Sequence, residues 1–194
     1  MSVILEAKDV SKTFRRGREL THALTSFSLT AEAGEILCLL GPDGSGKTTF
    51  LRLLTGLLQP DSGTIRVLGY DTVADAEKVQ SSIGYMPQKF GLYEDLTVME
   101  NMRLCAEMRA VPAEIRSERF LTLLEMTDLT KFTERLAGRL SGGMKQKLAL
   151  ACTLVSDPKL ILLDEPTVGV DPLSRRELWQ LLKHFSVERK ITIL

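Results

Sequence analysis

The sequence predicts an α/β fold with a mixed or parallel sheet at its core, an antiparallel β part at the N-terminus and an inserted helical section. Two continuous apolar runs, 35–40 and 160–163, are typical of strands covered on both faces. The first run leads directly into a glycine-rich loop and a helix-like segment. Between the two runs, from Val98 onward, apolar residues recur with helical spacing.

The N-terminal residues predict a small antiparallel sheet. Residues 3–10 mix β-branched and polar side chains, as a half-exposed strand does, and strand-like residues return at 27–30. We expect the polar loop 15–18 to separate these two strands.

The core elements follow in an order typical of a parallel sheet. After the strand at 35–40, we expect a helix over 47–58. The turn 60–63 leads to a strand at 64–67, and residues 83–86 predict one more.

The sheet resumes after the helical section, which Pro112 divides into separate helices. A strand is predicted at 160–163, a helix over 172–184 with Pro172 at its first position, and a further strand at 191–194.

We therefore interpret residues 1–194 as a single unit. Residues 1–87 and 155–194 form its core with the antiparallel part, and residues of about 88–154 form a helical subdomain. The chain shows no repeats or flexible linkers that would separate the two parts.

The composition excludes several classes of protein. Lys plus Arg equals Asp plus Glu at 25 each, so no overall positive field favours nucleic acid as a partner. The cysteines Cys38, Cys105 and Cys152 lack the spacing of a zinc site, and we expect them to be reduced core residues. The apolar runs are much shorter than the roughly 20 residues of a membrane-spanning helix. Work at a membrane would need another polypeptide or segment to cross it.

The glycine-rich loop has the pattern GxxxxGK[ST] between a predicted strand and a predicted helix. Its glycines allow backbone N–H groups to cradle phosphate, Lys47 would reach the β- and γ-phosphates, and Thr48 would ligate Mg²⁺. This predicts a P-loop NTPase, although kinases, GTPases and ATPases share the loop; the alternative is a turn that binds nothing. The candidate nucleotide-binding residues here are Gly41, Pro42, Asp43, Gly44, Ser45, Gly46, Lys47, Thr48 and Thr49.

Two carboxylates, Asp164 and Glu165, follow the apolar run 160–163. A buried strand would deliver them to the carboxyl edge of the sheet, where ligands bind in open α/β folds. Asp164 suits Mg²⁺ binding, and Glu165 suits the orientation and deprotonation of an attacking water. The pair favours a hydrolase over a kinase; the alternative is two solvated carboxylates at the end of a strand.

A third motif, LSGGMKQ at 140–146, opens a predicted helix. Ser141 is in a capping position, and Gly142 and Gly143 expose the N-terminus of the helix, which makes a second phosphate-binding device. One nucleotide can hardly be held by two separate helix N-termini of one monomer. The arrangement is explained if two chains complete each other's sites.

The phosphate loop, Gln88, LSGGMKQ, LLDEP and Asp171, in this order, resemble the nucleotide-binding domains of ABC transporters over essentially the whole chain. The variants at 41–49, 84–101 and 140–154 look most like the ATPase subunits of bacterial ABC-2-type exporters, including those with two cassettes in one polypeptide. The resemblance implies an ATPase that uses ATP and Mg²⁺, pairs with a second cassette and multi-span permease subunits, and lies on the cytoplasmic face of the cell membrane.

The resemblance also implies roles for residues around the nucleotide. Phe14 would stack on adenine, the alternative being a packed aromatic at a strand end. Gln88 would reach Mg²⁺ or the attacking water, and its loop, continuing through Tyr93, would sense the membrane partner. The alternative for Gln88 is an ordinary surface glutamine.

Further roles concern the facing cassette. Ser141 and Gly143 would touch the γ-phosphate held by the other chain, and Asp171 would link the two active sites. Because Asp171 precedes Pro172, a plain helix N-cap is the alternative, and both roles are compatible.

The chain departs from the family pattern in a few places. The switch histidine would follow the strand at 191–194, so we expect a truncated chain with feeble turnover. His22 and His184 are in other elements and are interpreted as surface or packing residues. Asp43 stands where many members have Asn, and an inward-pointing carboxylate there would weaken nucleotide binding.

Two other functions compete with transport. A soluble ABC protein acting on DNA or ribosomes is disfavoured by the compact interval between phosphate loop and signature, which lacks sustained heptads. A small-molecule P-loop kinase has no use for LSGGMKQ. The sequence does not encode the cargo.

Overall fold

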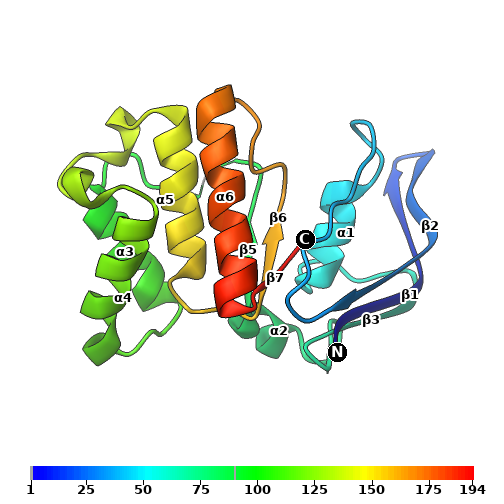
Figure 1. Cartoon of the computed structure of the whole chain (residues 1–194). Coiled ribbons are helices and arrows are strands. Elements are labelled where there is room, and N and C mark those ends of the chain that lie inside the picture. The colour runs from blue at the N-terminus through cyan, green and yellow to red at the C-terminus, as the bar shows by residue number, and fades with distance from the viewer. Residues whose placement is uncertain (1, 90) are drawn as a thin grey trace.

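The computed structural model describes residues 2–89 and 91–194 (Figure 1). Met1 and Phe90 lie outside the described residues, and Phe90 belongs to the segment 84–101 that carries part of the resemblance. The described chain forms an antiparallel sheet, a parallel sheet and a group of helices inserted between two strands of the parallel sheet. This agrees with the predicted α/β class.

The antiparallel sheet has the order β2-β1-β3-β4. Its strands are β1 (Val3–Arg16), β2 (Glu19–Glu32), β3 (Ser62–Val67) and β4 (Tyr70–Asp71). The expected loop at 15–18 was too long, because the β1–β2 ladder continues to the pair Arg16 and Glu19. Exposed polar strands satisfy their backbone groups by pairing and need no apolar alternation to do so, so the strand ends carry no signal in the sequence.

The parallel sheet has the order β5-β6-β7, with β5 (Ile83–Met86), β6 (Leu160–Leu163) and β7 (Thr192–Ile193). All four residues of β6 are buried, as the apolar run predicted. Ile161 and Leu163 pack in one hydrophobic cluster, and Leu160 and Leu162 pack in another. The strand therefore separates two cores, and its last residue delivers the chain to one edge of the sheet.

Three helices flank the two sheets. They are α1 (Lys47–Leu54), α2 (Ala76–Ser82) and α6 (Pro172–Arg189). Leu53 and Leu54 of α1 pack with Leu160 and Leu162, whereas Leu182 and Phe185 of α6 pack with Ile161 and Leu163. The helices α1 and α6 accordingly cover different faces of β6, as Figure 1 also shows.

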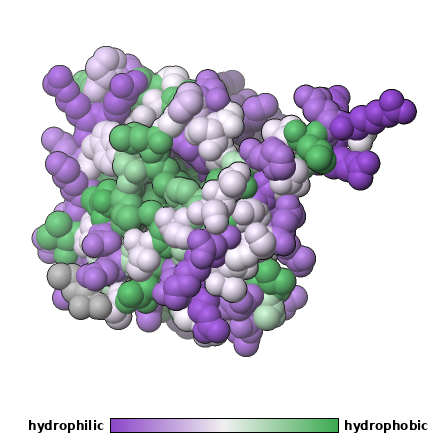
Figure 2. All heavy atoms as spheres, turned by 90° about the vertical axis from the view of Figure 1, so that its right-hand side faces the viewer, coloured by the Kyte–Doolittle hydropathy of each residue, from purple (hydrophilic) through white to green (hydrophobic). Residues whose placement is uncertain are grey.

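The strand expected at 35–40 is not formed. Its pairing is limited to a bridge between Ile36 and Ile193 and a hydrogen bond from Leu37 N to Ile193 O of 2.8 Å. Leu40 is 90% exposed and Cys38 is also exposed, which corrects the expectation that all three cysteines are core residues. The physical reason is that β7 offers only two paired residues, and within residues 2–89 and 91–194 no other strand pairs with this segment. Figure 2 shows a hydrophobic area among polar side chains on the side of the molecule where α1 and β1 to β3 lie.

The inserted helices are α3 (Val98–Met108), α4 (Ala113–Met126) and α5 (Gly142–Leu154), with the short turns η1 (Thr130–Phe132) and η2 (Ala137–Arg139). A capping box between Thr97 and Glu100 starts α3, and Pro112 precedes α4 as predicted. These helices lie beyond α6, away from α1 and the antiparallel sheet (Figure 1). In the described part of the chain, no helix combines the length and the apolar character needed to cross a bilayer.

Candidate functional site

One cavity gathers residues from four segments: the β1–β2 hairpin, the loop before α1, the loop after β5 and the end of β6. Its lining residues are Phe14, Thr21, Ala23, Asp43, Gly44, Ser45, Gly46, Lys47, Thr48, Thr49, Gln88 and Glu165. All of them except Thr21 and Ala23 were candidates from the sequence. Thr21 pairs with Phe14 in the hairpin, and this register has no sequence signal.

The loop at 41–46 is held tightly against β2. Gly46 is the N-cap of α1 with φ of 92°, and a Cβ there would overlap the carbonyl oxygen of Ala23. Only glycine combines this backbone conformation with this close approach. The N-terminus of α1 therefore lies directly at the end of the loop, where its free backbone N–H groups would attract an anion.

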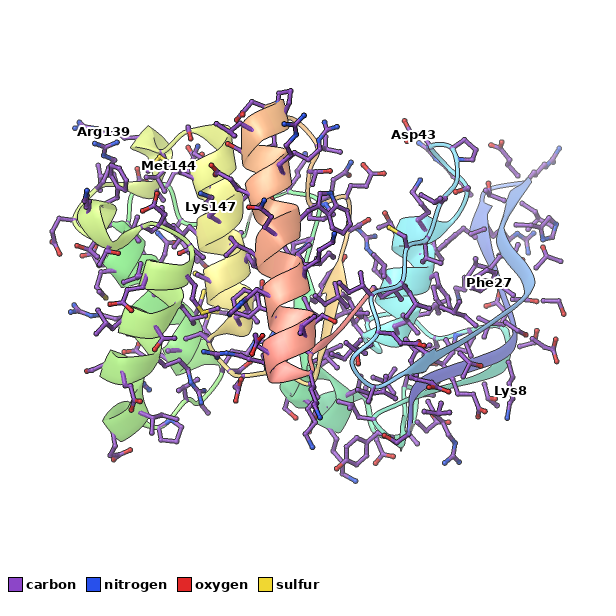
Figure 3. All side chains as sticks on the ribbon, in the orientation of Figure 1. Lys8, Phe27, Asp43, Arg139, Met144 and Lys147 are labelled. Carbon is purple, nitrogen blue, oxygen red and sulfur yellow. The ribbon has the colours of Figure 1, made fainter. Side chains whose placement is uncertain are left out.

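Lys47 folds back over the loop. Its Nζ donates to the carbonyl oxygen of Gly41 at 2.9 Å and to that of Pro42 at 3.1 Å. Asp43 is exposed at the tip of the loop, where Figure 3 shows it away from the body of the fold. The sequence left the direction of the Asp43 carboxylate open; in the structure Asp43 is exposed and also lines the cavity.

Thr48, which lines this cavity, contacts the buried Asp164, which does not line it. Thr48 Oγ1 donates to Asp164 Oδ1 at 3.0 Å, and Asp164 is 3% exposed. Oxygen ligands of Mg²⁺ lie at about 2.0–2.1 Å in an octahedron, so that adjacent ligands are about 2.9 Å apart. The spacing of these two oxygens fits a shared Mg²⁺. The backbone N–H of Asp164 also donates to Met86 O at 2.9 Å, which fixes the end of β6 against β5.

Glu165 lies between two polar partners. Its Oε2 accepts from Gln88 Nε2 at 2.8 Å, and its Oε1 lies 3.7 Å from Lys47 Nζ. The backbone of Glu165 has φ of 52°, the left-handed region that non-glycine residues rarely occupy. Such conformations cluster at functional sites. Glu165 and its neighbour Asp164 have different partners, Gln88 and Thr48.

Tyr85 does not line this cavity but lies near enough to Asp164 for that charge to act on its phenol. It precedes Met86 in β5 and is partly buried. Burial raises the pKa of Tyr85, and the negative charge of Asp164 adds to this effect, whereas Arg52 acts against it. The phenol therefore stays neutral beside the carboxylate over the physiological range.

The LSGGMKQ segment forms the N-terminus of α5, outside the cavity. Ser141 caps the helix by accepting from Met144 N at 3.2 Å. Gly142 lies near Gly169 O, and a Cβ on Gly143 would overlap the side chain of Ser174. The start of α5 and the phosphate loop lie at the same edge of the molecule, with α6 and β6 between them in Figure 1.

Asp171 caps the adjacent helix α6. Its Oδ1 accepts from Leu173 N and Ser174 N, both at 3.0 Å. Hydrogen bonding from Ser174 lowers the pKa of Asp171 below its ordinary value. The N-cap role is confirmed, and Asp171 does not line the cavity with the phosphate loop.

Neither histidine lines this cavity. His22 Nδ1 is 3.0 Å from Thr13 Oγ1 in the β1–β2 hairpin, and the ring of His184 packs edge-on to that of Phe185. Both arrangements agree with surface or packing roles.

The sequence profile of the ABC transporter family matches residues 24–168. This chain belongs to the ABC transporter family. The matched range includes the phosphate loop, Gln88, the LSGGMKQ segment and both carboxylates, whereas Phe14 and Asp171 lie outside it.

Curated relatives of this ABC protein include two bacterial ATP-binding proteins with names that refer to transport or export. It is 58% identical over 166 residues to the probable multidrug ABC transporter ATP-binding protein YbhF of Escherichia coli K12, covering 86% of the chain and 29% of YbhF. It is 37% identical over 190 residues to the Nod factor export ATP-binding protein I of Burkholderia lata, covering 98% of the chain and 61% of that protein. The chain thus spans less than a third of YbhF.

The fold of this ABC protein is that of an ATP-binding cassette. It superimposes on the dimeric, post-hydrolysis structure of the cassette MJ0796 bound to ADP and Pi with a TM-score of 0.86 and 32% identity. The match covers 97% of this chain and 85% of MJ0796. The family and this fold support ATP hydrolysis as the activity.

Proposed function

We propose that this cassette binds and hydrolyses MgATP as the cytoplasmic, energy-coupling subunit of an export system. The proposal is carried by one observation: the phosphate loop, Gln88 and Glu165 line a single cavity. The LSGGMKQ helix lies outside that cavity, which favours a site completed by a second cassette.

ATP would bind with its base at the hairpin and its phosphates on the loop. Phe14 is 39% exposed and lines the cavity, so its ring would give a base a flat apolar face on which to stack. The loop residues 41–49 would surround the phosphates with N–H groups. The ammonium of Lys47 would leave the carbonyl oxygens of Gly41 and Pro42 for the more strongly charged phosphates.

Mg²⁺ would be held by the oxygens of Thr48 and Asp164, together with Gln88 and the phosphates. When bound, the ion neutralises negative charge that develops on the phosphate oxygens. Asp164 is suited to this position because it is buried and fixed from both sides, by Thr48 and by the backbone of Met86.

Glu165 would take the proton of the attacking water. A general base must lie within hydrogen-bonding reach of the water, and Glu165 lines the cavity beside Lys47. Its other oxygen is occupied by the amide of Gln88 in this structure. Gln88 therefore stands where it can orient the water, the ion or the carboxylate as the nucleotide arrives.

A second cassette would supply Ser141, Gly142 and Gly143 to the γ-phosphate. In each chain these residues lie at the same edge as the phosphate loop but on the far side of α6. A partner related by a two-fold axis would place its own LSGGMKQ helix over the open phosphate loop, and the same operation completes the second site. The related MJ0796 structure is a dimer. Asp171, at the adjacent helix end, would communicate between the sites.

Multi-span permease subunits would receive the movement of the two cassettes. A separate cavity beside the loop that follows Gln88 is lined by Tyr93, Met108 and other apolar side chains, and it offers a docking place for the permease. The cassette would accordingly lie on the inner face of the cell membrane. The names of its relatives favour export.

The decisive experiment measures Mg²⁺-dependent ATP hydrolysis against protein concentration in the intact polypeptide. We expect specific activity to rise with concentration and to collapse in Lys47→Ala, Glu165→Gln and Ser141→Arg. Ser117→Arg on α4 introduces the same side chain at an exposed serine outside the proposed dimer face and should remain active. Concentration-independent activity that survives Ser141→Arg would replace the two-chain site with a self-contained P-loop enzyme.

A further inference from the structure

Two thiols on neighbouring helices line the cavity beside the loop that follows Gln88. Cys105 comes from α3 and Cys152 from α5, and the nucleotide site does not use either of them. Cys152 is buried in the hydrophobic cluster, and Cys105 packs against that cluster while staying partly exposed. The cavity is lined by Tyr85, Met86, Pro87, Gly91, Leu92, Tyr93, Cys105, Met108, Arg109, Ala149, Cys152 and Thr153.

The two thiols differ in their chemistry. A hydrogen bond from the Cys152 thiol lowers the pKa of Cys105, with a smaller contribution from the positive charge of Arg109, and burial opposes both. The same hydrogen bond and burial raise the pKa of Cys152 well above its ordinary value. Cys105 is thus the better thiolate, and Cys152 is a protonated thiol beside it.

The position of Arg109 is fixed by the fold. Its Nη1 donates to Gln80 O at 2.7 Å and to Ile83 O at 3.2 Å. Arg109 lies four residues after Cys105, one helical turn along the chain, and lines the same cavity. A reactive cysteine needs positive surroundings and partial access, and Cys105 has both.

We propose that Cys105 and Cys152 form a redox-modification site that a hydroperoxide converts into an intrachain disulfide. The Cys105 thiolate attacks the peroxide, the O–O bond breaks, and a sulfenic acid forms on Cys105 while hydroxide or alkoxide leaves. The Cys152 thiol then attacks the sulfenic sulfur; the S–O bond breaks, an S–S bond forms and water is released. Two electrons pass from the two thiols to the peroxide, and a dithiol reductant reverses the change.

The disulfide would join α3 to α5 behind the loop that carries Gln88 and Tyr93. The sulfurs must approach to about 2 Å, closer than any non-bonded contact. The side chains that line the cavity, Tyr93 among them, would have to adjust. Oxidation therefore acts on the wall of this cavity, and the nucleotide-binding residues stay chemically unchanged.

The test uses residues 1–194 with Cys38→Ser, which leaves the pair as the only cysteines in that range. The folded protein is treated with hydrogen peroxide, alkylated and digested with trypsin, which places the two cysteines in peptides 104–109 and 148–159. We expect these peptides to be linked within one chain, both thiols to be lost together, and dithiothreitol to restore them. Peptides that stay unlinked, or that link only between chains or only in the unfolded protein, would overturn the proposal.

Single variants in the same background separate the roles of the two thiols. With Cys152→Ser, Cys105 should stop at sulfenic acid, which dimedone traps; with Cys105→Ser, Cys152 should stay reduced. Equal rates of peroxide oxidation at Cys152 with and without Cys105 would reject the assigned order. Circular dichroism checks folding, and if either variant fails to fold, the oxidation rates of the two thiols in the parent protein decide, with Cys105 expected to react first.

Discussion

The side-chain amide of Gln88 donates to Oε2 of Glu165 across 2.8 Å. This bond joins the loop after β5 to the end of β6, and Lys47 approaches the other oxygen of the same carboxylate at 3.7 Å. The proposed phosphate-binding cation and the proposed base are therefore neighbours in this structure. Binding of phosphate at Lys47 would weaken its contact with Glu165 and leave that oxygen free for a water.

Replacement of the proposed base tests this relationship. Glu165→Gln should retain ATP binding and lower kcat by about 100-fold or more, because the amide cannot accept the proton of the water. Titration calorimetry and steady-state hydrolysis measure the two quantities. Glu118→Gln removes an exposed carboxylate from α4 and serves as the matched control. A Glu165→Gln kcat within tenfold of the wild type would assign the base elsewhere.

Thr48 offers a test of the metal site. Thr48→Ala should raise the Mg²⁺ concentration for half-maximal hydrolysis by about tenfold or more, because one oxygen ligand and the partner of Asp164 are lost. Thr48→Ser keeps the hydroxyl group and should stay close to the wild type. If the alanine variant has an unchanged requirement for Mg²⁺, Thr48 is not a ligand.

Gly46→Ala tests the packing of the phosphate loop on β2. An alanine in this left-handed conformation should lower the free energy of unfolding by about 1–3 kcal/mol. In addition, its Cβ would overlap the carbonyl oxygen of Ala23. Gly17→Ala has a similar positive φ in the hairpin turn but nothing near its Cβ. Denaturant unfolding should show a larger loss for Gly46→Ala than for Gly17→Ala; equal losses would mean that the loop can move away from β2.

Substitutions of Phe14 test whether its ring stacks on the nucleotide base or only packs at the end of the strand. Phe14→Ala should weaken ATP and GTP by similar factors, each by about 1–3 kcal/mol of binding free energy, because stacking tolerates any base. Phe14→Trp should preserve binding of both nucleotides. Affinity that is unchanged in Phe14→Ala would leave Phe14 as a strand-end packing residue.

The contact between Gly143 and Ser174 predicts energetic coupling between α5 and α6. Gly143→Ala should destabilise the protein by about 1–3 kcal/mol through overpacking, and adding Ser174→Gly should recover part of the loss because it removes the overlapping side chain. Unfolding of the two single variants and the double variant gives the coupling energy. Strictly additive effects would show that the two helix ends adjust independently.

Much of the site was predictable because motif and topology agreed. Thr48 follows a loop whose pattern has a known geometry, and Asp164 follows a fully apolar strand, so both were expected at one edge of the sheet. Their 3.0 Å hydrogen bond agrees with this expectation. The helix caps at Ser141 and Asp171 were also predictable, because capping depends on a few adjacent residues.

Other features depend on contacts between distant parts of the chain. The apolar run 35–40 predicts a strand, yet strand formation needs pairing partners that local sequence does not report. The approach of Gly143 to Ser174 and the placement of Cys105 and Cys152 at one cavity arise from helix packing, since their spacing in the sequence gives no sign of either.

The hydrogen bond from the Asp164 backbone to Met86 has a mechanical consequence. Met86 is two residues before Gln88, and Asp164 directly follows β6. The proposed metal ligand Asp164 and the proposed sensor Gln88 therefore extend from two strand ends that are paired with each other. A displacement of residues 87–89 would strain the hydrogen bond between Met86 and Asp164. A permease that moved these residues would change the positions of Gln88, Asp164 and Glu165 together. No contact through the rest of the cassette would be needed.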